Sequence, residues 1–333
     1  MSTEAPTLIT GATGFVGSAV ARAAASRGHR LRLLVRRGSD RGNVAGLEAE
    51  LVEGDLRDRA SLARAAEGCR YVFHVAADYR IWVPDPESMI AVNVLGTQAI
   101  MEAAKQAGVE RIVYTSSVAA LGLTKDGNPA DETAPVSEEM IIGAYKRSKH
   151  QAEQSVFRMV REHHLPAVIV NPAAPVGPRD IKPTPTGRMI ADAAAGRMPA
   201  YLDTGLNIVH VDDVAEGHLL ALERGRTGER YILGGENLSM PDILKLVDEA
   251  AGRRRSRVRL TEGVLWPMAL ASEALGRFGI EPLVTRDHLR MARKRMFFSS
   301  DKAMRELGYE PRPARQAIAD AVAWFRANGM VPA

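Results

Sequence analysis

The sequence predicts an α/β fold, in which a doubly wound parallel sheet of the Rossmann type is followed by a smaller C-terminal substrate lobe. Short apolar segments typical of strands alternate with helical patterns of about 10–15 residues, which indicates βαβ units. A glycine-rich turn follows the first apolar segment. Residues 71–77 form an almost uniformly apolar run, as expected for a strand that is covered on both faces.

The first predicted strand leads directly into a turn with the spacing Gly-x-x-Gly-x-x-Gly. Apolar residues recur at helical spacing from Phe15 onward, so the glycines lie where the first helix begins. A helix N-terminus carries unpaired N–H donors and partial positive charge, and glycine permits close approach, which together suit a pyrophosphate. The alternative is a glycine-rich turn that binds no ligand. We predict that a dinucleotide binds to Gly11, Thr13, Gly14, Phe15, Val16 and Gly17.

The residue that ends the second predicted strand, at residues 30–35, indicates which dinucleotide is bound. In such folds this position faces the adenosine ribose, where an acid accepts from a 2′-hydroxyl and an arginine suits a 2′-phosphate. Here Arg36 follows the strand, and no acid occurs before Asp40. We therefore predict NADP(H) in preference to NAD(H), which is kept as the alternative. The competing interpretation is that Arg36 and Arg37 are simply solvated.

The third and fourth predicted strands also end in residues that suit a cofactor. Asp55 and Leu56 follow the third strand, and the carboxylate either accepts from the adenine amino group or acts as a turn or cap residue. The fourth strand ends in the small residues Ala76 and Ala77, where a cofactor can lie close. His74 lies inside the apolar run, which predicts a hydrogen-bonded core histidine.

Three side chains predict the chemistry. The strand at residues 111–116 delivers Ser117 to the carboxyl edge of the sheet, where ligands bind in open α/β folds. A long helical pattern over residues 143–163 places Tyr145 and Lys149 on one face, because they are four residues apart. An ammonium beside a phenol lowers the pKa of the phenol. We expect Tyr145 to act as acid or base and Ser117 to hold the substrate oxygen.

Together these motifs resemble those of the extended short-chain dehydrogenase/reductases, which include nucleotide-sugar epimerases and the dihydroflavonol-4-reductase type. The resemblance covers essentially the whole chain. It implies a Ser117, Tyr145 and Lys149 triad, a proton relay through Lys149 that Asn93 supports, and contact of the backbone after Pro172 with the nicotinamide. The matching segments are residues 10–17, 55–56, 74–77, 93–97, 115–117, 145–149, 171–178, 297–302 and 306–309.

A closer resemblance is to hopanoid-associated members of the family, usually labelled sugar epimerases, carried by residues 76–79, 172–185 and 207–213. Arg36 departs from epimerases that keep NAD, because these usually have an acid at this position. Family dehydratases have an Asp-Glu pair after a Thr beside the catalytic strand, and Ser117-Val118-Ala119 departs from that pattern. We therefore expect an NADPH-dependent ketone reductase, with epimerisation as the alternative and a non-catalytic dinucleotide sensor as a weaker one.

The two candidate reactions use Tyr145 differently. In reduction, Ser117 holds a carbonyl and Tyr145 supplies the proton. In epimerisation, Tyr145 first acts as a base on a hydroxyl, and the hydride then returns to the opposite face. A terpenoid-type or lipid-linked substrate is a further hypothesis, which depends mainly on the hopanoid resemblance.

The C-terminal part predicts the substrate lobe. We expect a dinucleotide-binding domain over residues 1–171 and the lobe over residues 172–333, with residues 207–235 returning in part to the first domain. Arg179, Lys182 and Arg188 are either anion contacts or solvated charges. His210, Asp212 and Asp213 indicate a structural turn and not a metal site. The apolar residues 265–275 are interpreted as lobe core, with a lid or a membrane-touching face as alternatives.

Composition and charge limit the remaining classes of function and location. The chain has 333 residues, and its single cysteine, Cys69, excludes an internal disulfide and fits a reducing, cytoplasmic compartment. No apolar run is long enough to span a bilayer, and the polar residues 1–7 leave no room for a signal peptide. The net charge is +4, but the basic residues lack interleaved aromatics, so we expect no nucleic-acid partner. The clusters at residues 253–257 and 290–295 are interpreted as solvated. The resemblance implies a homodimer formed through the Tyr145 helix.

Overall fold

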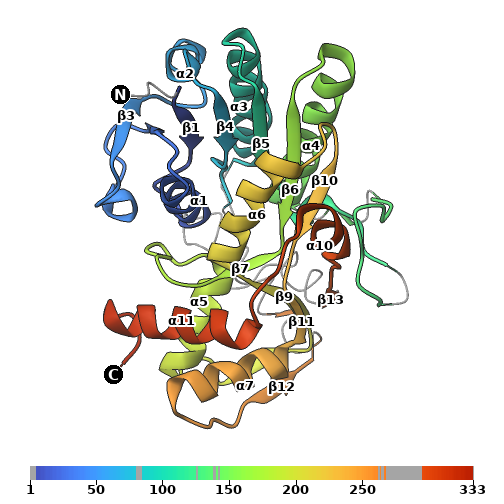
Figure 1. The fold of residues 1–333 in the computed structure, drawn as a ribbon. Helices are drawn as coiled ribbons and strands as arrows, with labels where there is room; N and C mark the ends of the chain where they lie inside the picture. Colours follow the sequence, from blue (N-terminus) through green and yellow to red (C-terminus); the bar gives the residue numbers. More distant parts are fainter. Residues whose placement is uncertain are drawn as a thin grey trace.

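A parallel seven-stranded sheet organises the molecule, as predicted (Figure 1). The computed structural model describes residues 5–79, 85–124, 127–137, 140–141, 143–261, 263, 266–267 and 295–332. The strand order is β10-β6-β5-β4-β1-β2-β3, so the direction of winding reverses between β1 and β4. The strands are β1 (Thr7–Thr10), β2 (Leu31–Val35), β3 (Ala49–Glu53), β4 (Tyr71–His74), β5 (Arg111–Thr115), β6 (Ala167–Pro172) and β10 (Arg230–Leu233).

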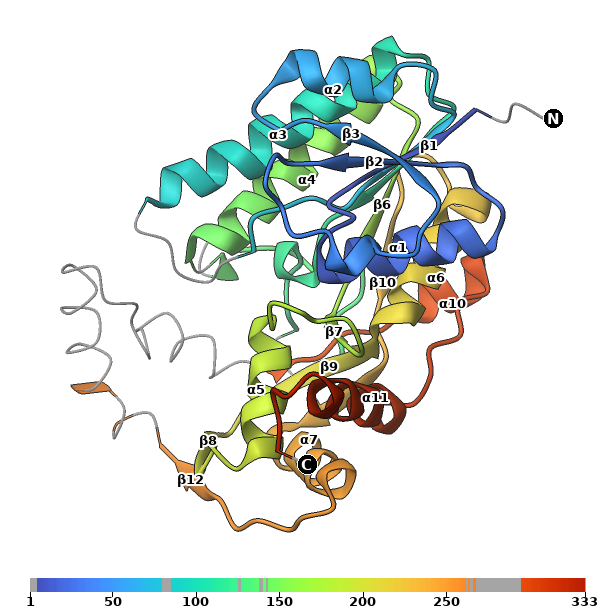
Figure 2. The same ribbon diagram turned by 90° about the vertical axis from the view of Figure 1, so that its left-hand side faces the viewer.

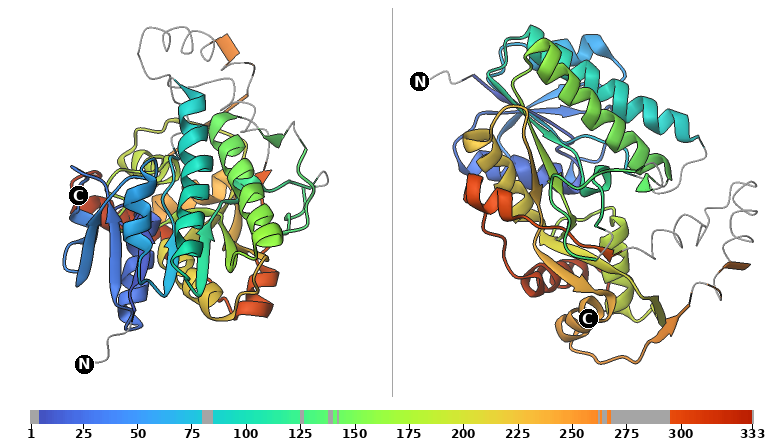
Figure 3. Two further views of the ribbon diagram at one scale, coloured as in Figure 1. Left: turned by 90° about the horizontal axis from the view of Figure 1, so that it is seen from above. Right: turned by 90° about the vertical axis from the view of Figure 1, so that its right-hand side faces the viewer.

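Helices cover both faces of this sheet, because its strands are apolar on both sides. One face packs against α2 (Arg59–Ala66), α3 (Pro86–Gln106) and α4 (Gly143–His163), and the seam is filled by aliphatic side chains such as Leu62, Ile100 and Val156. The other face packs against α1 (Phe15–Ser26), α6 (Val211–Arg224) and α10 (Asp301–Leu307). Figure 3 shows α3 and α4 side by side on their face of the sheet. Two short 3-10 turns, η1 (Gly42–Val44) and η2 (Val118–Ala120), lie beyond strand ends.

The lobe has its own sheet and its own core (Figure 2). Its central strand β9 (Gly205–His210) pairs with β7 (Ala174–Val176), β11 (Glu236–Ser239) and β13 (Arg295–Met296), and β8 (Ala200–Leu202) pairs with β12 (Val258–Leu260). Side chains from α5 (Pro185–Ala195), α7 (Met240–Ala251) and α11 (Ala314–Ala327) form the core, including Ile190, Leu244 and Phe325.

The segment at residues 207–235 divides between the two parts. Strand β9 pairs within the lobe sheet, whereas β10 pairs with β6 in the large sheet and α6 packs against α1. Helix α6 begins at Val211, because the ring of His210 accepts a hydrogen bond from the Asp212 N–H and caps the helix. We keep the boundary at residues 171/172 as a proposal.

One interpretation of the charged clusters is wrong. The Arg257 side chain is only 5% exposed and forms an ion pair with Asp248, with 2.7 Å between Nη2 and Oδ1. A desolvated guanidinium needs such a partner, so it is not a solvated loop charge. Most of residues 265–275, residues 290–294, and Trp82 lie outside the described residues. Among the helices that are described, none is long and apolar enough to cross a membrane.

Candidate active site

The turn between β1 and α1 is built so that only glycine fits at two positions. Gly11 has φ +73°, and a Cβ there would lie 2.7 Å from the backbone nitrogen of Ala76. A Cβ on Gly17 would lie 2.1 Å from the carbonyl oxygen of Gly11. Gly14 caps α1 without a side-chain hydrogen bond, and no acid occupies the first turn. This helix end therefore fits an anionic phosphate, with Thr13 and Gly14 at the helix entrance and Phe15, Val16 and Gly17 in its first turn.

The end of β4 is fixed to the same turn. The Thr10 hydroxyl accepts hydrogen bonds from the backbone N–H groups of Val75 and Ala76, both at 3.2 Å. His74 is fully buried, and its ring is bonded to the hydroxyls of Thr10 at 2.8 Å and Thr97 at 3.1 Å. Burial lowers the pKa of His74 to about 3. The prediction of a hydrogen-bonded core histidine is confirmed, and Ala76 and Ala77 follow β4 directly beside the glycine turn.

Arg36 and Asp55 lie beyond the carboxyl ends of β2 and β3. The Arg36 residue is exposed. The Asp55 carboxylate accepts from Arg57 Nε at 2.9 Å and Nη2 at 3.0 Å. This bond lowers the pKa of Asp55, and the Arg36 charge contributes in the same direction. Leu56 packs beneath α3, where a Cβ on Gly96 would lie 2.9 Å from the Leu56 Cβ. The roles of Arg36, Asp55 and Leu56 toward a cofactor stay predictions.

Ser117 and Tyr145 meet at the end of β5. The Ser117 hydroxyl accepts from the Ala119 N–H at 3.1 Å and caps η2. Burial raises the pKa of Tyr145, and the nearby Ser117 side chain offsets this only in part. The expected lowering by a neighbouring ammonium is wrong: burial raises the pKa of Tyr145, and the side chain that partly lowers it is Ser117 and not Lys149.

Lys149 is 4% exposed and is held by the sheet. Its Nζ donates to the carbonyl oxygen of Thr115 at 3.0 Å and lies 5.7 Å from the centre of the Tyr114 ring. Burial lowers the pKa of Lys149 to about 8, although the Glu153 charge raises it in part. The ammonium therefore loses its proton within the working pH range of many enzymes.

Asn93 links α3 to α4 beside Lys149. Its Oδ1 accepts from the Asp78 N–H at 2.7 Å, and its Nδ2 donates to the Asp78 carbonyl at 2.8 Å and to the Ser148 hydroxyl at 2.9 Å. These bonds fix the start of the loop after β4 and the residue next to Lys149. A proton relay through Lys149 that Asn93 supports stays a prediction, as does the contact of the backbone after Pro172, the last residue of β6, with a nicotinamide.

Two further residues join this site that the motifs did not single out, Glu153 and Arg230, and they are linked to Asn171 of the matching segment 171–178. Glu153 is fully buried on α4 and is bonded to Asn171 of β6 and Arg230 of β10. Glu153 follows Lys149 by four residues, so the spacing that placed Tyr145 and Lys149 on one face would also have found it. Arg230 carries no such signal in the sequence.

Two other charged regions do not join the site. Arg179, in a left-handed conformation with φ +75°, forms an ion pair with Asp212. His210 lies 3.2 Å from an Asp320 carboxylate oxygen. Among the described residues, no group of three or more His, Cys, Asp or Glu side chains could hold a metal ion.

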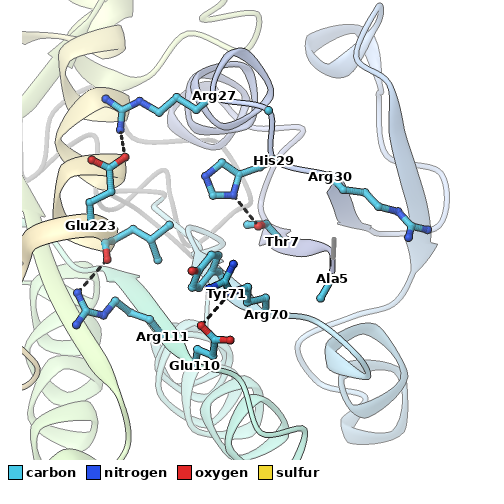
Figure 4. Close-up of a pocket in the computed structure, with 12 residues that line it drawn as sticks. Ala5, Thr7, Arg27, His29, Arg30, Arg70, Tyr71, Glu110, Arg111 and Glu223 are labelled. Atoms are coloured by element: carbon cyan, nitrogen blue, oxygen red, sulfur yellow. Dashed lines mark hydrogen bonds and ion pairs between the residues drawn. The ribbon is translucent and has the colours of Figure 1, made fainter. Parts of the chain in front are cut away.

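A hollow of about 550 Å³ lies at the opposite, amino edge of the sheet. Thr7, Tyr71 and Arg111 line it and are the first residues of their strands. Figure 4 shows its charges paired within the wall: Arg27 with Glu223, and Arg70 with Glu110. We do not assign it to the chemistry, because the glycine turn and Tyr145 are at the other edge.

The fold and the site define a class: a Rossmann-type α/β protein with a glycine turn, Ser117, Tyr145 and Lys149 at the carboxyl edge of its parallel sheet. The model of the NAD dependent epimerase/dehydratase family matches residues 7–234, and the chain belongs to this family. It is an NAD(P)-dependent enzyme of the oxidoreductase and epimerase type.

The chain is similar to three proteins whose names indicate different substrates. It is 44% identical to a Synechocystis sp. protein provisionally named dihydroflavonol 4-reductase, over 97% of this chain and 95% of that protein. It is 38% identical to sterol demethylase protein B of Methylococcus capsulatus, over 98% of this chain and 99% of that protein. It is 32% identical to 4-hydroxy-2-methyl-3-oxo-4-farnesyl-3,4-dihydroquinoline-1-oxide ketoreductase of Stigmatella aurantiaca, over 95% of each.

Two solved structures share the fold over nearly the whole chain. The crystal structure of gox2253 has 64% identity and a TM-score of 0.89, covering 98% of this chain and 100% of that one. The structure of PA4631, a nucleoside-diphosphate-sugar epimerase from Pseudomonas aeruginosa, has 30% identity and a TM-score of 0.81, covering 99% and 100%.

Proposed function

We propose that the protein is an NADP(H)-dependent ketone reductase. The observation that carries the proposal is the exposed Arg36 directly after β2. Asp55 lies near enough that the Arg36 charge lowers its pKa. A guanidinium in this place can pair with a 2′-phosphate, whereas NAD-specific relatives of this fold use an acid for the ribose hydroxyls. The triad of Ser117, Tyr145 and Lys149 lies at the same edge of the sheet.

The chain's own residues divide the work of reduction. The glycine turn and the N-terminus of α1 hold the phosphates, Arg36 holds the 2′-phosphate, and Asp55 accepts from the adenine amino group. The bound dinucleotide supplies the hydride that reduces the carbonyl. Ser117 holds the carbonyl oxygen, and Tyr145 donates a proton to that oxygen as charge develops on it. The raised pKa of Tyr145 suits a proton donor, because the phenol keeps its proton until the substrate oxygen accepts it.

The substrate proposed is a bulky, largely apolar ketone, linked to a terpenoid or hopanoid skeleton. Support comes from the names of relatives, which include a sterol demethylase protein and a ketoreductase of a farnesylated ring. We also propose a cytoplasmic homodimer formed through α3 and α4. The exposed Leu95 on α3 supports this arrangement, because it leaves an apolar side chain on that face.

The second candidate is epimerisation of a sugar or nucleotide sugar with NAD(P). The family model and the likeness to PA4631 favour it. The same triad serves this reaction with Tyr145 acting first as a base. A raised pKa of Tyr145 is less suited to that step, because a base must give up its proton before the reaction begins.

Dinucleotide binding tests the proposal. The purified protein is denatured, any released nucleotide is identified, and refolded protein is titrated with NADPH and NADH by fluorescence. We expect NADPH to bind at least about tenfold tighter, which is about 1.4 kcal/mol. Arg36→Glu should remove that preference, whereas the neighbouring variant Arg37→Glu should keep most of it. Release of near-stoichiometric NAD with weak NADPH binding would refute the reductase and favour the epimerase.

A further inference from the structure

A largely buried cluster of three polar residues, Glu153, Asn171 and Arg230, adjoins the backbone of Ser117. Glu153 of α4 is fully buried, and its Oε1 lies 2.8 Å from Arg230 Nη1 of β10. Its Oε2 accepts from Asn171 Nδ2 of β6 at 2.7 Å. Arg230 is also bonded to the carbonyl oxygen of Glu132. Burying a carboxylate and a guanidinium together costs desolvation energy, so their retention calls for an explanation.

Asn171 connects this cluster to Ser117. Its Nδ2 donates both to Glu153 and to the Ser117 carbonyl oxygen, the latter at 3.0 Å. The Asn171 Oδ1 atom is buried without a hydrogen-bond partner in the described part of the chain. The orientation of the amide therefore depends on the two bonds that Nδ2 makes. Because Glu153 accepts one of them, it sets where the amide holds the backbone of Ser117.

Glu153 also lies one helical turn from Lys149, in a region that excludes water. A carboxylate at this spacing stabilises the ammonium form of a buried lysine. Arg230 neutralises part of that carboxylate charge, so the two partners act on Lys149 in opposite directions.

We propose that Glu153 is a positioning residue of the active site: through Asn171 it fixes the strand end that carries Ser117, and its charge, moderated by Arg230, keeps Lys149 protonated. The proposal deepens the proposed function, because the triad it supports is the one assigned to that reaction. It does not depend on which substrate or dinucleotide the enzyme uses.

Few other groups near Lys149 change charge between pH 6 and 10. His74 of β4 stays neutral, because its pKa is about 3. Tyr114 of β5 stays a phenol, because burial raises its pKa well above the ordinary value. Tyr145 of α4 also has a raised pKa. The charge that raises the pKa of Lys149 is therefore the Glu153 carboxylate, one turn along the same helix. Arg230 affects Lys149 indirectly, because it pairs with that carboxylate.

The titration of Lys149 can be measured without any cofactor. The full-length protein is labelled with ¹³C at the lysine ε-carbons, the Lys149 resonance is assigned as the one missing from Lys149→Arg, and its shift is followed by NMR from pH 6 to 10. In the wild type we expect a midpoint near pH 8. In Glu153→Gln the midpoint should fall by about 0.5–1 pH unit, because the stabilising charge is lost. In Arg230→Gln it should rise, because the carboxylate is no longer neutralised.

Opposite shifts distinguish this role from a structural one. Loss of packing alone would leave the Lys149 midpoint unchanged or move it the same way in both variants, and either result overturns the proposal. Arg230→Lys retains the positive charge and should restore a midpoint near that of the wild type. Should Glu153→Gln fail to fold, the two Arg230 variants still test the proposal. The Lys149 midpoint should rise in Arg230→Gln and return to near the wild-type value in Arg230→Lys. The matched control is Asp248→Asn, which breaks the buried pair with Arg257 in the lobe and should lower stability with no shift.

Hydrogen exchange tests the contact with Ser117. Glutamine at position 153 can still accept from Asn171, whereas alanine cannot. Peptides that contain residues 116–120 should therefore exchange at least about tenfold faster in Glu153→Ala than in Glu153→Gln. Equal exchange in both variants would refute the link through Asn171. Failure of NADPH binding would instead contradict the proposed function and leave both of these readouts intact.

Discussion

Tyr145 and Lys149 lie one turn apart on α4, but burial acts on their charges in different ways. It keeps the phenol protonated and at the same time makes the ammonium easier to deprotonate. The Ser117 side chain, just beyond β5, acts on the phenol, and the Thr115 carbonyl at the end of β5 accepts from the ammonium. The tyrosine therefore has a proton to give, whereas the lysine is held by the end of the strand.

Removing the phenol hydroxyl should separate catalysis from binding. We expect Tyr145→Phe to lower turnover by at least about 100-fold, as is typical when a general acid is lost. NADPH oxidation is followed by absorbance with a panel of polycyclic and aromatic ketones, and dinucleotide affinity by fluorescence. Affinity should stay close to that of the wild type. The control Tyr71→Phe, at the amino edge of the sheet, should change neither turnover nor dinucleotide affinity. Full turnover by Tyr145→Phe would rule out Tyr145 as the proton donor.

His218 makes the fold sensitive to acid. It is fully buried between Val214 and Thr115, and burial lowers its pKa to about 4. Above pH 6.5 the ring is neutral in both the folded and the unfolded chain. As the pH falls from 6.5 to about 4, the unfolded chain binds a proton that the folded chain does not, so the free energy of unfolding decreases by roughly 3 kcal/mol.

Denaturant unfolding at pH 7, 6 and 5 checks this contribution. The variant His218→Gln cannot be protonated, so its free energy of unfolding should decline less steeply with falling pH than that of the wild type. His74 remains in both proteins, and its own contribution cancels in the comparison. Parallel pH slopes for the two proteins would contradict the assignment.

At the scale of elements, the turn from β1 to α1 is the most tightly built part of the site. Gly17 of α1 lies against the carbonyl of Gly11, and Gly11 lies against the end of β4. These contacts bring three chain segments within van der Waals distance at the point where the phosphates are expected to bind. The site therefore depends on backbone packing as much as on side chains.

An added methyl group should open this turn. Gly17→Ala would place its Cβ 2.1 Å from the Gly11 oxygen, so α1 must move away from β1. We expect dinucleotide affinity to fall by at least about tenfold and thermal stability to decrease. The control Gly28→Asn has open space around a left-handed residue, a conformation that asparagine tolerates, and should bind normally. Wild-type affinity in Gly17→Ala would show that the turn can adapt.

The elements that the sequence predicted well are those with long periodic patterns and local signals. The helix expected over residues 143–163 and the strand over residues 30–35 match α4 and β2 within one residue at each end. Helix α6 begins at Val211 directly after His210, a cap that is not one of the usual short polar residues, so the sequence carries no ordinary signal for its start. Local pattern was sufficient wherever the stabilising contacts are local.

The parts that were missed depend on contacts between distant segments. Arg257 was interpreted as solvated, because the sequence does not show that the loop after α7 turns back to place it against Asp248 of that helix. The pKa of Tyr145 follows from burial in the folded protein, which helical spacing does not report. Arg230 joins Glu153 across 77 residues of sequence. Such pairs become visible only when the topology has placed the strands side by side.

At the scale of the whole molecule, the sheet and the lobe have separate apolar cores. Phe73 lies in the core between the sheet and α1, and Phe325 of α11 lies in the lobe core with Ile318 and Val322. Gly11 of the glycine turn lies against Val75 and Ala76, just after β4. Stability and dinucleotide binding should therefore be separable by choosing which core is changed.

Phe325→Ala should lower the free energy of unfolding by about 3–5 kcal/mol, the usual cost of a large cavity. Dinucleotide affinity should stay within about twofold of the wild type, because the change is remote from the glycine turn. Trp324, whose ring lies 5.5 Å from that of Phe325, reports on the lobe by fluorescence. Phe73→Ala is the matched comparison and should weaken binding as well, since β4 leads directly to Ala76. Equal loss of binding in both variants would indicate a single cooperative core.

The pairing of Glu153 with Arg230 also has a consequence for synthesis. Glu153 of helix α4 leaves the ribosome 77 residues before Arg230, the arginine that pairs with its buried carboxylate. At about 5–20 residues per second, that interval lasts roughly 4–15 s. During it the nascent sheet lacks its edge strand β10, and Glu153 remains without its cation. The active site can therefore close only late in translation, and a pause between the codons for these two residues would prolong the time in which this carboxylate stays hydrated.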